Sequence, residues 1–248
     1  RDGRTLSRAV VRPICTPILP YLQSMDTMTA FKNLIKRTPL ARLYIYVKSL
    51  FRTPASQSNE GEIAERLALQ FNVPRVFIEF GFSGWEFNCV RLAKDEQWEG
   101  LLADGNAWNI AIARQLFHKR IQCNEMWITL QTLDVMLDYA RSREIGILSV
   151  DVDGNDYWFL QKLLTIKPAI VIAEFNVSFG LSPITVPYDP GFDRTRKHAS
   201  CEYYGASLPA LCHLCGAHNY SLVEISRNGV NAFFVRNDLL MSQVQTLT

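Results

Sequence analysis

The stretch Ile145-Gly-Ile-Leu-Ser-Val-Asp-Val-Asp-Gly154 decides the fold of this 248-residue chain. It is apolar on both faces up to Val150 and then turns acidic, which is typical of a parallel strand that helices cover on both sides. Similar apolar runs lie at residues 76–80, 100–104 and 169–175. Helical patterns separate the runs, at residues 62–71, 108–117, 133–140 and 157–164. The alternation predicts a doubly wound α/β fold with a mostly parallel sheet.

The last part of the chain departs from this alternation. A long loop at residues 177–205 precedes a helix at 206–215, and two apolar runs follow at 220–225 and 230–235. The dipeptide Asn228-Gly229 lies between the two runs, where it is a strong hairpin signal. We therefore expect the sheet to finish with an antiparallel strand.

The charged residues divide the chain into two parts. Residues 1–54 carry ten Lys and Arg against two acids, whereas the remaining residues carry 16 basic and 22 acidic side chains. We expect a basic N-terminal helical segment and linker at residues 1–60, and an α/β domain at residues 61–248. The acidic domain argues against a nucleic-acid partner, because a surface that follows phosphates needs the opposite charge.

Hydropathy and cysteine content suggest a cytoplasmic protein. No run reaches the roughly 18 apolar residues that a membrane-spanning helix needs. The six cysteines do not form a dense disulfide framework, so we expect reduced thiols. Cys212-His-Leu-Cys215 with His218 has the look of a zinc site. Both cysteines fall inside an expected helix without a second pair, so packing in the core is the favoured interpretation.

An amphipathic helix is expected at residues 40–51. Residues 29–52 carry six basic side chains and no acid. The apolar stripe of the helix consists of Leu40, Leu43, Tyr44, Val47, Leu50 and Phe51. The favoured interpretation is that this stripe packs on the domain or forms a homodimer contact. The alternative is a weak peripheral contact with an anionic membrane surface.

The first candidate site motif follows the run at 76–80. In an open α/β sheet, ligands bind at the carboxyl ends of the strands, where the strand order reverses. Glu79-Phe-Gly81-Phe82-Ser-Gly84 supplies a sharp glycine turn beside a carboxylate. Its spacing does not match the phosphate-binding pattern Gly-x-Gly-x-x-Gly, so a cationic or zwitterionic ligand fits better than an anion.

The second candidate is Asp104, which ends the next run. A carboxylate at that place can accept both hydroxyls of a ribose, as in dinucleotide-binding folds. The alternative is that Asp104-Gly-Asn106 is a turn that caps the following helix.

The densest polar cluster is Ser149-Val-Asp151-Val-Asp153-Gly-Asn-Asp156. Three carboxylates at the end of a buried strand repel one another unless a metal, a ligand or hydrogen-bond donors compensate. We therefore favour a functional site over a helix cap. One carboxylate can act as general base for a hydroxyl, and others can hold the ligand or a divalent cation. Glu174 and Asn176 end the next run and are expected to extend this polar floor.

These motifs, in order and spacing, resemble those of FkbM-like class I methyltransferases over about residues 73–176. The resemblance rests on Glu79-x-Gly81, Asp104, Thr132-Leu-Asp134, Val150-Asp-Val-Asp-Gly154 and Pro168-Ala-Ile-Val-Ile-Ala-Glu174. It implies a Rossmann-like, seven-stranded sheet with one antiparallel strand, and S-adenosylmethionine (SAM) as the methyl donor.

The resemblance also implies a set of cofactor-binding residues. Glu79, Gly81 and Gly84 would line the methionine side of SAM, and Asp104 would hold the ribose. Their neighbours Phe82 and Asn106 are included in the cofactor-binding set. Phe82 or Trp85 stands where the family has a third small residue, which alters the cofactor loop.

A second departure concerns a metal. FkbM-like proteins read Asp-x-Glu-Gly where this chain has Asp151-Val-Asp153-Gly154. That sequence is similar to the Asp-Gly-Asp signature of metal-dependent sugar O-methyltransferases. Mg²⁺ is therefore a candidate cofactor.

The expected activity is SAM-dependent methyl transfer to a hydroxyl, of a sugar or glycan-linked small molecule. Asp151 and Asp153 are the expected catalytic residues, with His198 as an acid or base from the loop that follows the last parallel strand. The basic residues at 194–197 are candidates for contact with an anionic substrate. The alternatives are a catalytically silent methyltransferase-like binding module and a nucleotide-binding Rossmann oxidoreductase.

Overall fold

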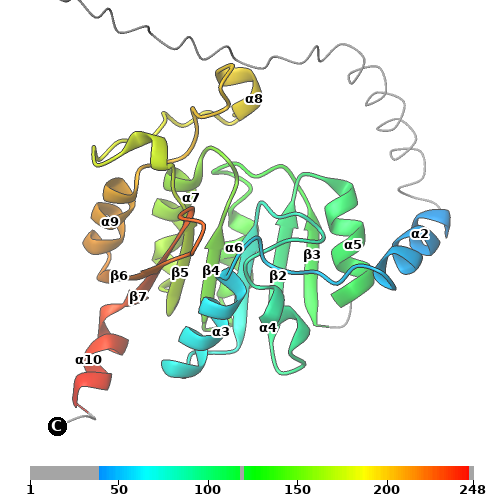
Figure 1. Ribbon diagram of the computed structural model, residues 1–248. Helices are drawn as coiled ribbons and strands as arrows, with labels where there is room; N and C mark the ends of the chain where they lie inside the picture. The colour runs from blue at the N-terminus through cyan, green and yellow to red at the C-terminus, as the bar shows by residue number, and fades with distance from the viewer. Residues whose placement is uncertain (1–38, 118–119, 246–248) are drawn as a thin grey trace, which may run out of the picture. The chain divides into compact units, whose positions relative to one another are not determined.

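A computed structural model describes residues 39–117 and 120–245 of the chain, and in this part seven strands form one sheet (Figure 1). The strand order is β3-β2-β1-β4-β5-β7-β6. The strands are β1 (Val76–Phe80), β2 (Glu99–Asp104), β3 (Ile121–Glu125), β4 (Ile147–Val150), β5 (Ile170–Glu174), β6 (Tyr220–Ile225) and β7 (Asn231–Arg236).

Strands β1 to β5 are parallel to one another, and β7 runs antiparallel to both of its neighbours, β5 and β6. The hairpin at Asn228-Gly229 is closed by bonds from Ser226 N to Asn231 O (2.8 Å) and from Gly229 N to Ser226 O (2.8 Å). The mostly parallel sheet with an antiparallel strand at the end of the chain is thus confirmed.

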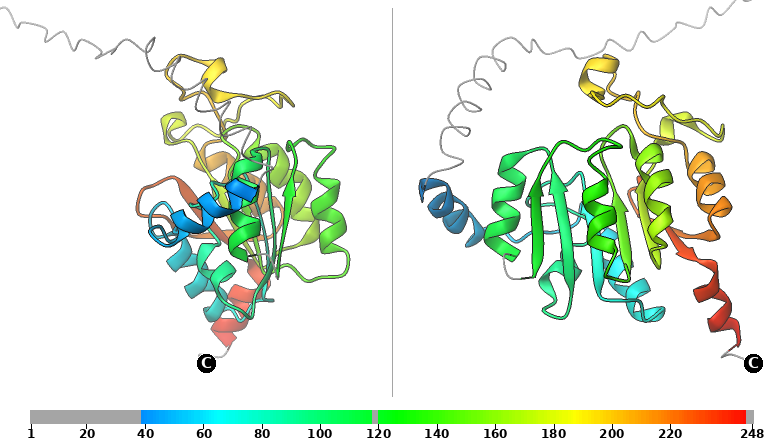
Figure 2. Two further views of the ribbon diagram at one scale, coloured as in Figure 1. Left: turned by 90° about the vertical axis from the view of Figure 1, so that its right-hand side faces the viewer. Right: turned by 180° about the vertical axis from the view of Figure 1, so that it is seen from behind.

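Helices cover both faces of the sheet (Figure 2). One face packs against α3 (Glu60–Gln70), α4 (Val90–Lys94), α5 (Ala107–Phe117) and α10 (Asn237–Gln245). The other face packs against α6 (Asp134–Ala140), α7 (Asp156–Leu163) and α9 (Leu208–Ala217). The expected helices agree with α3, α5, α6, α7 and α9 to within about two residues at each end, whereas α4 and α10 were not expected.

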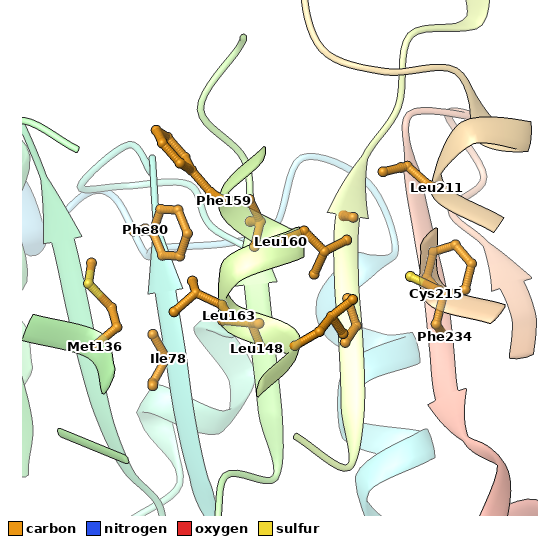
Figure 3. Packing of buried hydrophobic residues seen from close by; sticks show 14 of the residues in the cluster. Ile78, Phe80, Met136, Leu148, Phe159, Leu160, Leu163, Leu211, Cys215 and Phe234 are labelled. Atoms are coloured by element: carbon orange, nitrogen blue, oxygen red, sulfur yellow. The ribbon is translucent and has the colours of Figure 1, made fainter. Parts of the chain in front are cut away.

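The core is divided by the sheet because neighbouring residues of a strand point to opposite faces. Phe77 belongs to the cluster on the α3 face and Ile78 to the cluster on the α7 face. Figure 3 shows the second cluster, in which Leu160 and Leu163 of α7 face Leu148 of β4. The burial of both faces explains why the runs at 76–80, 147–150 and 170–174 are apolar without alternation.

Cys215 of α9 is fully buried in the same cluster. Cys212 is half-buried and packs against this cluster. The five cysteines in the described part of the chain are free thiols, and Cys15 lies outside it. None of the helices in residues 39–117 and 120–245 combines the length and the apolar character needed to cross a membrane.

The first described helix, α2 (Pro39–Ser49), is oriented differently from the expectation. Ile45 packs with Trp85 and Ile112, whereas the expected apolar stripe is exposed at Leu43, Tyr44, Val47, Leu50 and Phe51. Of the expected stripe, Tyr44 contacts the domain, with its ring centroid 5.6 Å from that of Trp108, and a dimer contact stays a prediction. Helical spacing reveals an apolar stripe but not the residue that faces the domain.

The segment between α2 and α3 is bonded to the domain. Ala55 N donates to Trp85 O (3.1 Å), and Phe87 N donates to Ala55 O (3.2 Å). This segment therefore lies beside the loop that follows β1. The division of the chain at residue 60 stays a prediction, and residues 1–38 of the basic segment lie outside the described residues.

The packing predicts the response to a core truncation. Leu160→Ala should lower the free energy of unfolding by about 2–5 kcal/mol, because it removes buried apolar contacts and leaves a cavity between α7 and the sheet. Leu69→Ala is the matched control, since Leu69 on α3 is 72% exposed. Urea denaturation of both variants checks this, and equal effects would contradict the assigned core.

Candidate active site

The strand order reverses between β1 and β4, which are hydrogen-bonded neighbours although β2 and β3 lie between them in sequence. At such a switch point the loops leave in opposite directions and open a crevice at the carboxyl ends of the strands. The loop after β1 and the acidic residues after β4 meet there. The structure thus brings together the first and third candidate motifs of the sequence.

Glu79, at the end of β1, holds the loop that follows this strand through hydrogen bonds. Its carboxylate accepts hydrogen bonds from Asn88 N (2.7 Å) and Cys89 N (2.8 Å), and the residue is fully buried. Asn88 in turn donates from Nδ2 to Ser149 Oγ of β4 (3.1 Å). Burial raises the pKa of Glu79, while the two backbone amides act in the opposite direction. Both oxygens of Glu79 therefore have a structural role in shaping residues 81–89.

Gly81 and Gly84 permit two close approaches. Gly81 has a φ of +74°, and a Cβ at this position would lie 1.7 Å from the carbonyl oxygen of Asp151. A Cβ at Gly84 would lie 2.8 Å from Cβ of Ile112 on α5. The side chain of Phe82 is buried in the core cluster, so of this residue only the backbone is available at the site.

Asp104 joins the first motif to the second. Its carboxylate accepts from Asn106 N (2.7 Å), from Asn109 Nδ2 (3.0 Å) and, more weakly, from Phe82 N (3.3 Å). Asn106 Oδ1 accepts from Trp108 N (2.9 Å) at the start of α5. Burial raises the pKa of Asp104, although hydrogen bonds to the carboxylate oppose the shift. The capping turn expected at Asp104-Gly-Asn106 is therefore present, and the side chain of Asp104 is half-buried.

Two residues near Asp104 were not identified from the sequence. Asn109 donates both to Asp104 and to Phe82 O (2.7 Å), and its Oδ1 accepts from Gly84 N (3.1 Å). Trp127 packs against Gly105: a Cβ at Gly105 would be 3.0 Å from Cε3 of the indole. The only sequence signal for Trp127 is a large aromatic residue just after the run at 121–125, and it is 59% exposed.

The acidic cluster gathers after β4 and β5. Asp156 accepts from Val152 N (2.8 Å) and Gly154 N (2.9 Å), and burial raises its pKa to about 6. Asp151 directly follows β4 and Glu174 ends the neighbouring strand β5, and their carboxyl groups interact with each other. Burial and then the neighbouring carboxylates raise the pKa of both well above the usual range. Oε2 of Glu174 is buried and has no donor among the described residues.

Asp153 is more exposed than Asp151 and Glu174, and its carboxylate reaches the long loop. It has a positive φ of 55°, is largely exposed and forms an ion pair with Arg194. The guanidinium of Arg194 lies 3.9 Å from the ring centroid of Tyr204 and also donates to Cys201 O (3.1 Å). Arg194 therefore holds residues of the long loop over the acidic cluster.

The other charges of the loop are paired internally. Arg196 binds Asp193, and Lys197 binds Asp189 at 2.7 Å. Contact of these residues with an anionic substrate would have to compete with those acids. His198 is exposed, and its Nδ1 lies 2.8 Å from Ser200 Oγ. Within the described part of the chain, His198 is bonded to Ser200 and forms no hydrogen bond or ion pair with the carboxyl cluster.

The loop at 177–205 is fixed across the carboxyl edge of the sheet. It contains only η2 (Val177–Phe179) and α8 (Arg194–Lys197) as regular structure. In Figure 1 its yellow part, with α8, lies beyond the ends of the strands. Its anchors are hydrogen bonds from Trp158 Nε1 to Val186 O (2.9 Å), Asn155 Nδ2 to Asp189 O (2.7 Å), Trp127 Nε1 to Pro190 O (2.8 Å) and Asn176 Nδ2 to Tyr204 O (2.9 Å).

Comparisons with known proteins bear on the fold. No family model and no curated protein matches the chain. An O-methyltransferase from Bacillus cereus in complex with SAH is similar, with 16% identity over 85% of this chain and 97% of that chain, at a TM-score of 0.49. The O-methyltransferase TomG from Streptomyces achromogenes, involved in tomaymycin synthesis and solved with SAM, has 13% identity over 85% and 96% of the two chains, at a TM-score of 0.48.

A third similar structure is the N-terminal domain of EvdMO1 in the presence of SAH and D-fucose, with 12% identity over 73% of this chain and 83% of that chain, at a TM-score of 0.45. At these identities and TM-scores the similarities assign neither activity nor substrate. The fold follows from the sheet itself: its order and its antiparallel β7 are those of the Rossmann-type, class I methyltransferase-like fold that the sequence resemblance implied.

The raised pKa values predict how stability depends on pH. The folded protein binds protons more tightly than the unfolded chain at Asp151, Asp156 and Glu174, so the free energy of unfolding should fall as pH rises. For Asp156 the fall lies between its ordinary value of 3.8 and about 6, and the Asp151–Glu174 pair extends it to higher pH.

Asp151→Asn and Glu174→Gln should therefore raise the melting temperature at pH 8 more than at pH 5, because each removes a buried negative charge. Asp138→Asn, at an exposed position of α6, is the control and should leave the pH dependence unchanged. Thermal denaturation at the two pH values measures the effect. A stability that rises with pH in the parent protein would contradict the protonated cluster.

Proposed function

We propose that this chain is a SAM-dependent O-methyltransferase whose acceptor is a hydroxyl of a sugar or of a glycan-linked small molecule. One observation carries the proposal: a glycine turn, the half-buried carboxylate of Asp104 and the interacting carboxyl groups of Asp151 and Glu174 meet at the switch point of this sheet. The resemblance to FkbM-like methyltransferases in residues 73–176 supports the same assignment.

The donor side of the site would be formed by the ends of β1 and β2. Asp104 would accept the ribose hydroxyls, and its Oδ2 has only a 3.3 Å bond to a backbone amide to give up. The exposed indole of Trp127, over Gly105, offers an apolar surface for a purine. Gly81 and Gly84 bring the backbone of the loop close to the ligand, while Glu79, Phe82 and Asn106 shape that loop and the helix cap behind it.

The charge of the site suits this donor. When bound, SAM supplies an electrophilic methyl group on a positively charged sulfonium. Four carboxyl groups lie together at the site, those of Asp151, Asp153, Asp156 and Glu174. Arg194 is the nearby cation: it forms an ion pair with Asp153 and partly offsets the rise that burial causes in the pKa of Glu174. An excess of carboxylates favours a cationic ligand over an anionic one.

The acceptor side needs a group that takes up a proton. The acceptor oxygen forms a bond to the methyl carbon as the carbon–sulfur bond breaks, and its hydroxyl proton must leave. Burial raises the pKa of both Asp151 and Glu174, which makes either carboxylate a stronger base than an exposed one. We assign the base to this pair and assign Asp153, through Arg194, to positioning the loop.

A divalent cation is not needed for this scheme. In the described part of the chain, no three His, Cys, Asp or Glu side chains are arranged to hold a metal ion. The neutral side chain nearest in sequence to Glu174 that could supply a metal ligand is Asn176. Its amide nitrogen already donates to Glu202 O and Tyr204 O, and its amide oxygen accepts from Ser178 N. These residues do not fit Mg²⁺, and no step is assigned to it.

Calorimetric titration with SAM and with SAH tests the donor. Both should bind, with the same affinity in the presence and absence of Mg²⁺, and NAD(H) should not. Asp104→Ala should weaken SAM binding by roughly 10- to 150-fold, the equivalent of one charge-assisted hydrogen-bond interaction. Asp95→Ala, at the opposite end of β2, is the control. Binding of NAD(H) instead would indicate a Rossmann oxidoreductase, and binding of neither would indicate a silent module.

Turnover separates the two expected catalytic aspartates. With a panel of sugar acceptors, Asp151→Asn should lower kcat by about 10²–10⁴-fold while SAM affinity is kept, because a general base is lost. Asp153→Asn should raise KM for the acceptor and leave kcat nearly unchanged, because it frees Arg194 and the loop. Release of SAH measures both. The reverse pattern would place the base at Asp153.

A further inference from the structure

Residues 42–52 present an apolar surface that is largely exposed, although the ring of Tyr44 at its edge also lies 5.6 Å from the ring of Trp108 in the domain. Leu43, Tyr46, Leu50 and Phe51 are 59%, 55%, 62% and 87% exposed, and Tyr44 and Val47 are also exposed. We call these six residues the α2 ridge. Scattered exposed apolar side chains are ordinary, but six within nine consecutive residues form a patch that marks an interaction site.

The helix geometry separates the ridge from the side that packs on the domain. Ile45 contacts Trp85 and Ile112 and is fully buried. At about 100° per residue, Leu43 and Val47 lie about 160–200° around the helix from Ile45. The domain therefore holds α2 from behind and presents the ridge outward.

Basic residues lie along the two flanks of the ridge. Arg42 and Lys48 are each three residues from Ile45, so they lie about 60° to either side of it. Arg52 follows in the turn after α2, with its guanidinium 5.6 Å from the ring of Trp85. The sequence has no acid between Asp26 and Glu60. Nothing in this stretch of sequence neutralises the three cations.

We propose that the α2 ridge docks the protein on an anionic membrane surface. An apolar ridge between basic flanks can enter the headgroup region while long cationic side chains reach the lipid phosphates. Tyr44, Tyr46 and Phe51 suit that region, where aromatic rings are enriched. Each basic residue near such a surface adds about 1 kcal/mol. The proposal does not depend on the methyl-transfer reaction.

A second copy of the chain is a less suitable occupant. A two-fold contact through the ridge is self-complementary, so it would bring Arg42, Lys48 and Arg52 of one copy toward the same cations of the other. Like charges placed opposite one another at an interface disfavour it. An anionic lipid surface pairs with all three cations at once.

Vesicle sedimentation with the full chain tests the proposal. The protein should bind phosphatidylcholine vesicles that contain phosphatidylserine far more tightly than vesicles of phosphatidylcholine alone, and added salt should weaken the binding. Arg42→Gln/Lys48→Gln/Arg52→Gln should weaken it on the order of a hundredfold. Leu43→Ser/Val47→Ser/Leu50→Ser/Phe51→Ser should also abolish most of the binding.

Leu69→Ser is the matched control, because Leu69 is an equally exposed leucine on α3 and should bind as the parent does. Melting temperatures of all variants verify that they fold. Equal binding to both kinds of vesicle, or binding that the ridge variants retain, would overturn the proposal. So would a dimer in analytical ultracentrifugation that the ridge serines dissociate, since the ridge would then be covered by a second copy.

Discussion

The backbone of Gly81 lies against the carbonyl oxygen of Asp151, at a distance that no side chain would permit. This approach brings the loop after β1 to the acidic residues after β4, and it follows directly from the pairing of those two strands. A parallel sheet that reverses its strand order at this pair places two loops side by side although about 70 residues separate them in sequence. The proposed donor and acceptor sides of the site, and the loop at 177–205, are all arranged around this contact.

Carboxylates are distributed around the contact in two different states. Glu79 and Asp156 each accept two backbone amides, which compensate for burial and make these acids part of the scaffold. Asp151 and Glu174 interact with each other and with the neighbouring charges, and one oxygen of Glu174 has no donor among the described residues. Carboxyl groups whose burial is not compensated are typical of functional sites, and this agrees with the base proposed for the reaction.

The sequence predicted the framework well because the signals for it are local. Runs apolar on both faces appear wherever a strand is buried between helix layers, and the Asn-Gly turn identified the hairpin before β7. It did not reveal α4, which has five residues, or α10, whose apolar face is interrupted by polar residues. For α2 the apolar periodicity was real, but one residue outside the stripe, Ile45, faces the domain.

The sequence by itself determined the order of strands and helices, the parallel sheet and the presence of acids at the strand ends, because each depends on neighbours within a few residues. Only the tertiary structure decided which partners each of these acids has. Asp151 meets Glu174 across the β4–β5 pair, Asp153 meets Arg194 from a loop 41 residues away, and Trp127 meets Gly105 across β2 and β3. Burial, the interaction of neighbouring carboxyl groups and pairing with amides depend on such distant partners, and no local pattern specifies them.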